Sequence, residues 1–141
     1  EFPTDMQSVM MAAAALADGT SHIRENVFEN RFCVAKELQK LGAHIIIEDK
    51  FAQVSGVEAL KGTSVMAEDL RGGAALVVAA LSARGKSLVE ETRHIDRGYA
   101  GLWEVLASLG GRIGREMQPL DAAVKKIPSK KQIYLAFGAK R

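Results

Sequence analysis

The chain runs twice through one pattern of glycines, acids and arginines, and this internal repeat constrains the fold more than any local propensity does. Four residues of the first pass recur 66 residues later in the second: Gly19 and Gly85, Ser21 and Ser87, Glu25 and Glu91, Arg31 and Arg97. We therefore place one repeat at about 4–68 and a second at about 69–116, both within one domain, residues 1–116. No linker or low-complexity stretch divides the two repeats.

Each repeat is expected to form a helix, a strand, a second helix and a second strand. The first helices, 8–17 and 73–83, are apolar almost all round, so we expect them to be enclosed on every side. The segment 31–41 has one apolar face, which is typical of a surface helix. The sequence therefore predicts an inside-out α/β barrel of βαβαββ-like repeats, with Ala-rich helices inside and sheets outside. The expected strands are 21–25, 45–47, 51–55, 64–67, 87–91, the stretch around 113, and a last one at 132–137.

Polar residues and glycines mark where these helices should begin and end. Thr4 opens a capping-box pattern, and Asn30 and Asp96 can cap the second helix of each repeat. Gly42 and Gly110 can end those second helices.

Three arginines fall where a helix is expected to begin, namely Arg31, Arg71 and Arg97. A helix N-terminus carries partial positive charge, so a cation there is mildly unfavourable, by roughly 0.3–1 kcal/mol. Three arginines in this unfavourable position suggest an anionic ligand, because free backbone N–H groups and guanidinium forks together bind phosphate or carboxylate. Asp5 and Asp69 could exchange protons with such a ligand, or simply complement and cap their helices.

Composition and single residues exclude several other classes of function. A net charge of +2 is too weak to indicate a nucleic-acid partner, and no apolar run approaches the roughly 20 residues of a membrane span. The three histidines lack metal-ligand spacing, so no metal site is expected. Cys33, the single cysteine, is interpreted as a packed thiol in a reducing cytoplasm. The basic residues of 117–141 are interpreted as a solvated tail.

Four ordered motifs resemble the enolpyruvyl transferases, in particular the UDP-N-acetylglucosamine 1-carboxyvinyltransferase family. They are Phe2-Pro3-Thr4-Asp5-Met6-Gln7, Val27-Phe28-Glu29-Asn30-Arg31-Phe32, Asp69-Leu70-Arg71-Gly72-Gly73-Ala74-Ala75-Leu76-Val77 and His94-Ile95-Asp96-Arg97-Gly98-Tyr99. The resemblance implies transfer of enolpyruvyl from phosphoenolpyruvate to the 3′-hydroxyl of UDP-N-acetylglucosamine, without a cofactor. It further implies a cytoplasmic enzyme of peptidoglycan synthesis, which serves cell wall biogenesis, cell shape, the cell cycle and cell division.

The same resemblance implies roles for individual residues. Asp5 is similar to the aspartate that contacts the sugar hydroxyl and is a candidate base, and Asp69 resembles a second acid/base carboxylate. Val27 resembles a main-chain contact to the UDP-sugar. Arg31, Arg71 and Arg97 resemble the arginines around phosphoenolpyruvate, with Arg97 on a mobile segment.

The resemblance covers only the C-terminal portion of such an enzyme, up to about residue 115. We therefore expect the isolated chain to be inactive, its partner being the missing N-terminal part. Open sheet edges would favour self-association. Two alternatives stay open: the related shikimate-pathway enolpyruvyl transferase, and a non-catalytic binding or assembly module on the same fold.

Overall fold

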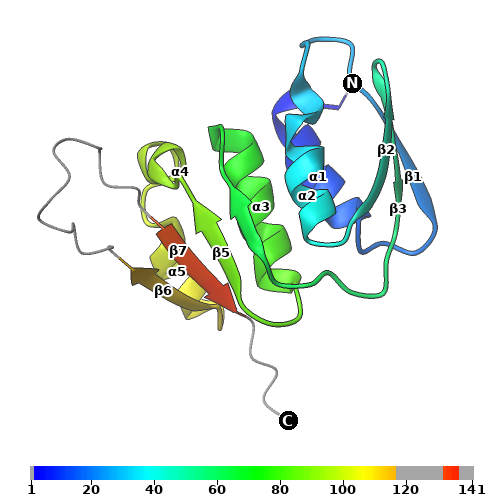
Figure 1. Cartoon of the computed structure of the whole chain (residues 1–141). Coiled ribbons are helices and arrows are strands. Elements are labelled where there is room, and N and C mark those ends of the chain that lie inside the picture. The colour runs from blue at the N-terminus through cyan, green and yellow to red at the C-terminus, as the bar shows by residue number, and fades with distance from the viewer. Residues whose placement is uncertain (1, 117–131, 137–141) are drawn as a thin grey trace, which may run out of the picture.

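Helices form the centre of the molecule and sheets form its two outer sides in the computed structural model, which describes residues 2–116 and 132–136 (Figure 1). The helices are η1 Thr4–Met6, α1 Gln7–Ala14, η2 Arg31–Cys33, α2 Val34–Lys40, α3 Leu70–Ser82, α4 Arg93–Gly98 and α5 Leu102–Ser108. The strands are β1 Thr20–Arg24, β2 His44–Glu48, β3 Phe51–Ser55, β4 Ser64–Met66, β5 Ser87–Glu90, β6 Arg112–Glu116 and β7 Gln132–Ala136.

The core lies between the sheets, where α1, α2 and α3 pack against one another (Figure 1). Met11 of α1, Leu38 of α2 and Leu76 of α3 are all at most 1% exposed. Small residues such as Ala75 and Ala79 line α3 and allow neighbouring helices to approach closely. The predicted arrangement, with helices inside and sheets outside, is confirmed.

The two sheets share one strand order. The first is β1-β3-β2, wholly antiparallel, with Thr20 and His44 both opposite Ser55. In the second, β5-β7-β6 follows the same antiparallel order, and β4 adds a parallel strand beside β5. β7 therefore occupies the place that β3 has in the first sheet, within the segment where a last strand is expected.

The two central helices differ in how far they are enclosed. α3 is buried along most of its surface, with a narrow exposed stripe that includes Val78. The prediction that 8–17 and 73–83 are enclosed on every side is wrong for both, and more so for the first. Val78 is 40% exposed in the second segment, whereas Met10 and Leu16 are 44% and 36% exposed in the first. Within residues 2–116 and 132–136, no element covers that face of α1.

The helix ends follow the predicted glycines better than the predicted caps. Gly42 and Gly110 follow α2 and α5 with φ of +94° and +97°, a left-handed conformation that glycine adopts without steric cost. Thr4 does not cap a helix, since its hydroxyl donates to Glu25 instead. Asn30 stands at the N-cap of η2, but its side chain makes no capping hydrogen bond.

The second helix of the second repeat is not one helix beginning at Arg97, as predicted, but two. Gly101, with φ of +72°, separates α4 from α5. Asp96 lies inside α4 and does not cap it; its Oδ1 accepts a hydrogen bond from Trp103 Nε1 at 2.6 Å, which ties the two helices together. Arg97 therefore lies in the last turn of a helix rather than in the first.

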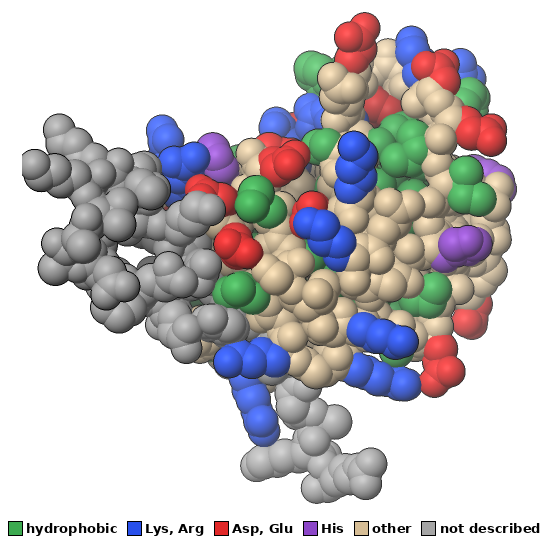
Figure 2. Space-filling model, in the orientation of Figure 1, with side chains coloured by type: hydrophobic (Ala, Val, Ile, Leu, Met, Phe, Trp, Pro, Cys, Tyr) green, Lys and Arg blue, Asp and Glu red, His purple; other side chains and the backbone are tan. Residues whose placement is uncertain are grey.

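No helix in the described part of the chain is long and apolar enough to cross a membrane. On the face shown in Figure 2, Lys and Arg side chains are interspersed with Asp and Glu rather than gathered in one patch.

Candidate functional site

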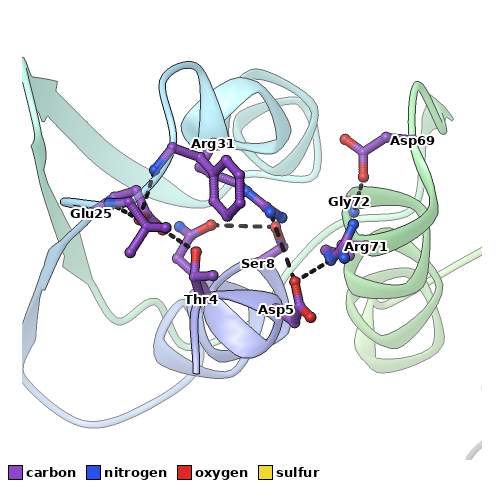
Figure 3. A network of polar contacts seen from close by, with 11 residues as sticks. Thr4, Asp5, Ser8, Glu25, Arg31, Asp69, Arg71 and Gly72 are labelled. Atoms are coloured by element: carbon purple, nitrogen blue, oxygen red, sulfur yellow. Dashed lines mark hydrogen bonds and ion pairs between the residues drawn. The ribbon is translucent and has the colours of Figure 1, made fainter. Parts of the chain in front are cut away.

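The starts of three helical segments, η1, η2 and α3, meet around one carboxylate (Figure 3). Asp5, in η1, lies between Arg31 at the start of η2 and Arg71 in the first turn of α3. Asp5 Oδ1 is 2.6 Å from Arg71 Nε and 3.7 Å from Arg31 Nη2. The fold thus brings together two of the three predicted arginines and one predicted carboxylate, from segments far apart in the sequence.

This cluster remains open to solvent on one side. The Asp5 side chain is 62% exposed and that of Arg71 is 39% exposed. Ion pairs this exposed contribute only about 0–1 kcal/mol to stability, so the fold does not depend on them. The guanidinium groups can therefore exchange Asp5 for an anionic ligand at small cost.

Arg31 is held more firmly than Arg71. Its side chain is only 16% exposed, and its Cζ lies 4.4 Å from the centroid of the Phe28 ring. A guanidinium over an aromatic face gains roughly 0.5–2 kcal/mol, depending on how far it is desolvated. Phe28 thus fixes the position of the Arg31 charge beside Asp5.

Asp69 caps α3, as one of its two interpretations predicts. Its Oδ1 accepts from the Gly72 N–H at 2.8 Å, and Oδ2 accepts from Cys33 Sγ at 3.7 Å. Partial burial and the Asp69 carboxylate together raise the pKa of the Cys33 thiol, although the residue as a whole is exposed. Asp69 is therefore engaged on both oxygens, two residues before Arg71 (Figure 3).

Glu25 is a functional candidate that sequence reasoning did not single out. It follows β1 and is only 5% exposed. One oxygen accepts from Thr4 Oγ1 at 2.6 Å, and the other accepts from the N–H groups of Val27 and Phe28 at 2.8 and 3.3 Å. Burial alone would raise the pKa of Glu25, but these hydrogen bonds and the Arg31 charge hold it below its ordinary value. In the sequence, Glu25 was noted because a glutamate recurs at position 91, and this recurrence indicated the internal repeat rather than a functional site.

Val27 lies where two open cavities adjoin. One, of about 410 Å³, is bounded by η1, α1 and β1, and the other, of about 450 Å³, extends along the loop to Arg31. Both are lined by Glu25, Asn26 and Val27. The N–H of Val27 is already donated to Glu25, which fixes the backbone between the two cavities.

Arg97 stands apart from the other two predicted arginines. It is exposed, and no hydrogen bond or ion pair joins it to another residue in the described part of the chain. Its helix, α4, nevertheless packs on the start of α3. Gly98 lies so close to Leu70 that an added Cβ would be 2.4 Å from Leu70 Cδ1. Arg97 thus lies on an element that touches the site without joining the cluster itself.

Histidine, cysteine, aspartate and glutamate side chains are the common protein ligands of metal ions. Within residues 2–116 and 132–136, no group of three or more of them is placed to hold a metal ion.

The fold resembles solved structures of enolpyruvyl transferases. The enolpyruvyl transferase NikO from Streptomyces tendae matches with a TM-score of 0.70 and 38% identity, over 75% of this chain and 25% of that one. EPSP synthase from Acinetobacter baumannii matches with a TM-score of 0.66 over 96% of this chain and 29% of that one; at 18% identity this likeness concerns the fold alone.

Curated relatives are more similar in sequence. A UDP-N-acetylglucosamine 1-carboxyvinyltransferase of Anaeromyxobacter sp. (strain Fw109-5) is 56% identical over 115 residues, which cover 82% of this chain and 27% of the relative. One of Desulfofundulus thermocisternus is 53% identical over 130 residues, covering 89% and 54%. The chain thus spans between about a quarter and a half of the length of these relatives. A family model described as EPSP synthase (3-phosphoshikimate 1-carboxyvinyltransferase) matches residues 1–106, and the chain therefore belongs to this family of enolpyruvyl transferases.

Proposed function

We propose that this chain is part of an enzyme that transfers enolpyruvyl from phosphoenolpyruvate to the 3′-hydroxyl of UDP-N-acetylglucosamine. Two kinds of observation support this. Relatives at 53–56% identity carry the name of that transferase. The single structural observation that carries the proposal is the Asp5 carboxylate between the guanidiniums of Arg31 and Arg71, at the start of α3.

The cluster suits a small, multiply charged substrate. Phosphoenolpyruvate carries a carboxylate and a phosphate, both of which guanidinium forks bind in bidentate fashion. Arg31 and Arg71 would hold these groups, and the first turn of α3 adds its partial positive charge. Arg97 would complete the set if α4 brings it to the bound substrate.

The reaction needs proton transfers that two carboxylates can carry out. The methylene carbon of phosphoenolpyruvate gains a proton as the sugar oxygen attacks the adjacent carbon, which gives a tetrahedral intermediate. Loss of a proton and of phosphate then restores the double bond. Asp5 would take the proton of the sugar hydroxyl, Asp69 would serve as the second acid/base group, and Val27 would contact the UDP-sugar through its main chain.

The proposal extends to the rest of the enzyme and to its place in the cell. The N-terminal part, outside this sequence, would supply the remaining contacts to both substrates, so residues 1–141 alone should not turn over. The reaction would supply a peptidoglycan precursor in the cytoplasm and thereby serve cell wall growth, cell shape and cell division.

The test is phosphate release from phosphoenolpyruvate and UDP-N-acetylglucosamine. We expect none from the isolated chain. We expect turnover from a chimera in which residues 2–116 replace the aligned stretch of the Anaeromyxobacter relative. An inactive but folded chimera would contradict the proposed function, and turnover by the isolated chain would contradict the need for a second part.

Two competing functions give different outcomes. The family model carries the name of the shikimate-pathway enzyme, and that function predicts thermal protection of the chimera by shikimate 3-phosphate but not by the UDP-sugar. A non-catalytic module predicts that Arg97→Ala leaves the activity of the chimera unchanged.

A further inference from the structure

We propose that Glu25 is a positioning residue, which holds the Asp5 segment and the Val27–Phe28 backbone in one fixed relation for the sugar nucleotide. This inference rests on the proposed function, because it assigns Glu25 a role toward the substrate that Asp5 and Val27 would contact.

The contacts of Glu25 reach three parts of the site. Through Oε2 it holds Thr4, the residue before Asp5, and through Oε1 it holds the N–H groups of Val27 and Phe28. Figure 3 shows Glu25 on the far side of Thr4 from Asp5, with Arg31 nearby. Since the Phe28 ring lies against the Arg31 guanidinium, the same carboxylate also supports the position of Arg31.

The burial of Glu25 makes these contacts specific. A carboxylate that is 5% exposed needs hydrogen-bond donors, because an unpaired buried charge is strongly unfavourable. Three donors converge on it, and bonds to an ionised acceptor are shorter and stronger than neutral ones. Thr4 and the Val27–Phe28 loop cannot move apart without losing them.

The second repeat shows that the scaffold itself does not require this arrangement. Glu91 occupies the equivalent position, but within residues 2–116 and 132–136 its carboxylate pairs only with exposed Arg93, at 3.4 Å. No backbone N–H in the described part of the chain donates to the Glu91 side chain. The three-way contact therefore belongs to the repeat that carries Asp5, and Glu91 provides a matched control.

The kinetic test uses the chimera described above. We expect Glu25→Ala to raise the KM for UDP-N-acetylglucosamine by about tenfold or more, since small displacements of positioning groups have effects of this order, with a smaller change in the KM for phosphoenolpyruvate. Glu25→Gln should restore most of the loss, because its remaining oxygen can still accept from Val27 and Phe28. Glu91→Ala should leave both KM values unchanged.

A second measurement separates the two proposals. In the 141-residue chain, amide hydrogen exchange should accelerate at Val27 and Phe28 in Glu25→Ala but not in Glu91→Ala, with circular dichroism confirming that both variants fold. Equal exchange in the two variants, or equal KM values in the active chimera, would overturn the positioning role. An inactive parent chimera would contradict the proposed function, and the exchange result would still decide whether Glu25 holds the loop.

Discussion

The two sheets, β1-β3-β2 and β4-β5-β7-β6, share an antiparallel order of three strands, but the repeats associated with them contribute different residues to the site. The first supplies an exposed carboxylate, Asp5, and a fixed cation, Arg31. The second supplies the beginning of α3, with Asp69 and Arg71. Because the site lies where the two N-terminal helix ends meet, neither repeat alone would form it.

The repeats also differ in how far their first helix is buried and in whether their second helix is continuous. α3 is buried apart from a narrow stripe that includes Val78, whereas η1 and α1 leave Met6 and Met10 exposed. α2 continues without a break from η2, whereas its counterpart is divided at Gly101 into α4 and α5. Each difference gives an experiment in which one repeat serves as the control for the other.

The largest effect is expected from the buried helix. Leu76→Ala in α3 should lower the free energy of unfolding by about 2–5 kcal/mol, because it removes a fully buried side chain and leaves a cavity. Met10→Ala on the open face of α1 should cost less than about 1 kcal/mol. Urea unfolding at two protein concentrations measures both. If both variants lose the same free energy of unfolding, and this loss changes with protein concentration, a second copy of the chain covers α1.

Removal of a guanidinium from the cluster should come next. In the chimera, Arg71→Ala should lower kcat by about 10²–10³-fold, the usual consequence of deleting one preorganised donor to a developing charge. Arg84→Ala should have no effect, because Arg84 follows the far end of α3 and forms an exposed pair with Glu58. Similar losses in both variants would show that the Asp5 cluster is not the reacting centre.

The two glycine helix stops should behave alike. Gly42→Ala and Gly110→Ala should each cost about 1 kcal/mol of unfolding free energy, because both positions have positive φ and open space around them. Gly114→Ala in β6 has open space without positive φ and should be close to neutral. Thermal unfolding of the three variants tests this, and unequal costs at 42 and 110 would contradict the equivalence of the repeats.

The smallest effect concerns Cys33, which has no cysteine counterpart in the second repeat. Its raised pKa leaves less thiolate at neutral pH, so alkylation by iodoacetamide should be slower than for free cysteine and should rise only at higher pH. Asp69→Asn keeps a side chain that can cap α3 but removes the charge, so the rate at pH 8 should increase several-fold. An unchanged rate would show that Asp69 does not act on the thiol.

Periodicity and punctuation in the sequence determined the scaffold. Apolar residues all round two Ala-rich segments predicted helices inside sheets, and Gly42 and Gly110 marked helix ends, because these signals depend only on residues near in sequence. Positions at helix starts and the resemblance of four motifs predicted Asp5, Arg31 and Arg71 as site residues, and the fold brings these three together.

Tertiary packing decided what those local signals could not. Thr4 looked like a cap, but a buried carboxylate 21 residues away takes its hydroxyl. Asp96 was also predicted to cap a helix, yet it lies inside α4 and accepts a hydrogen bond from Trp103. Hydrogen bonds to a buried or charged partner outweigh the modest local preference of a capping side chain, and such partners come from distant segments. For the same reason, the sequence alone could propose three equivalent arginines, and only the folded chain separates Arg31 and Arg71 from Arg97.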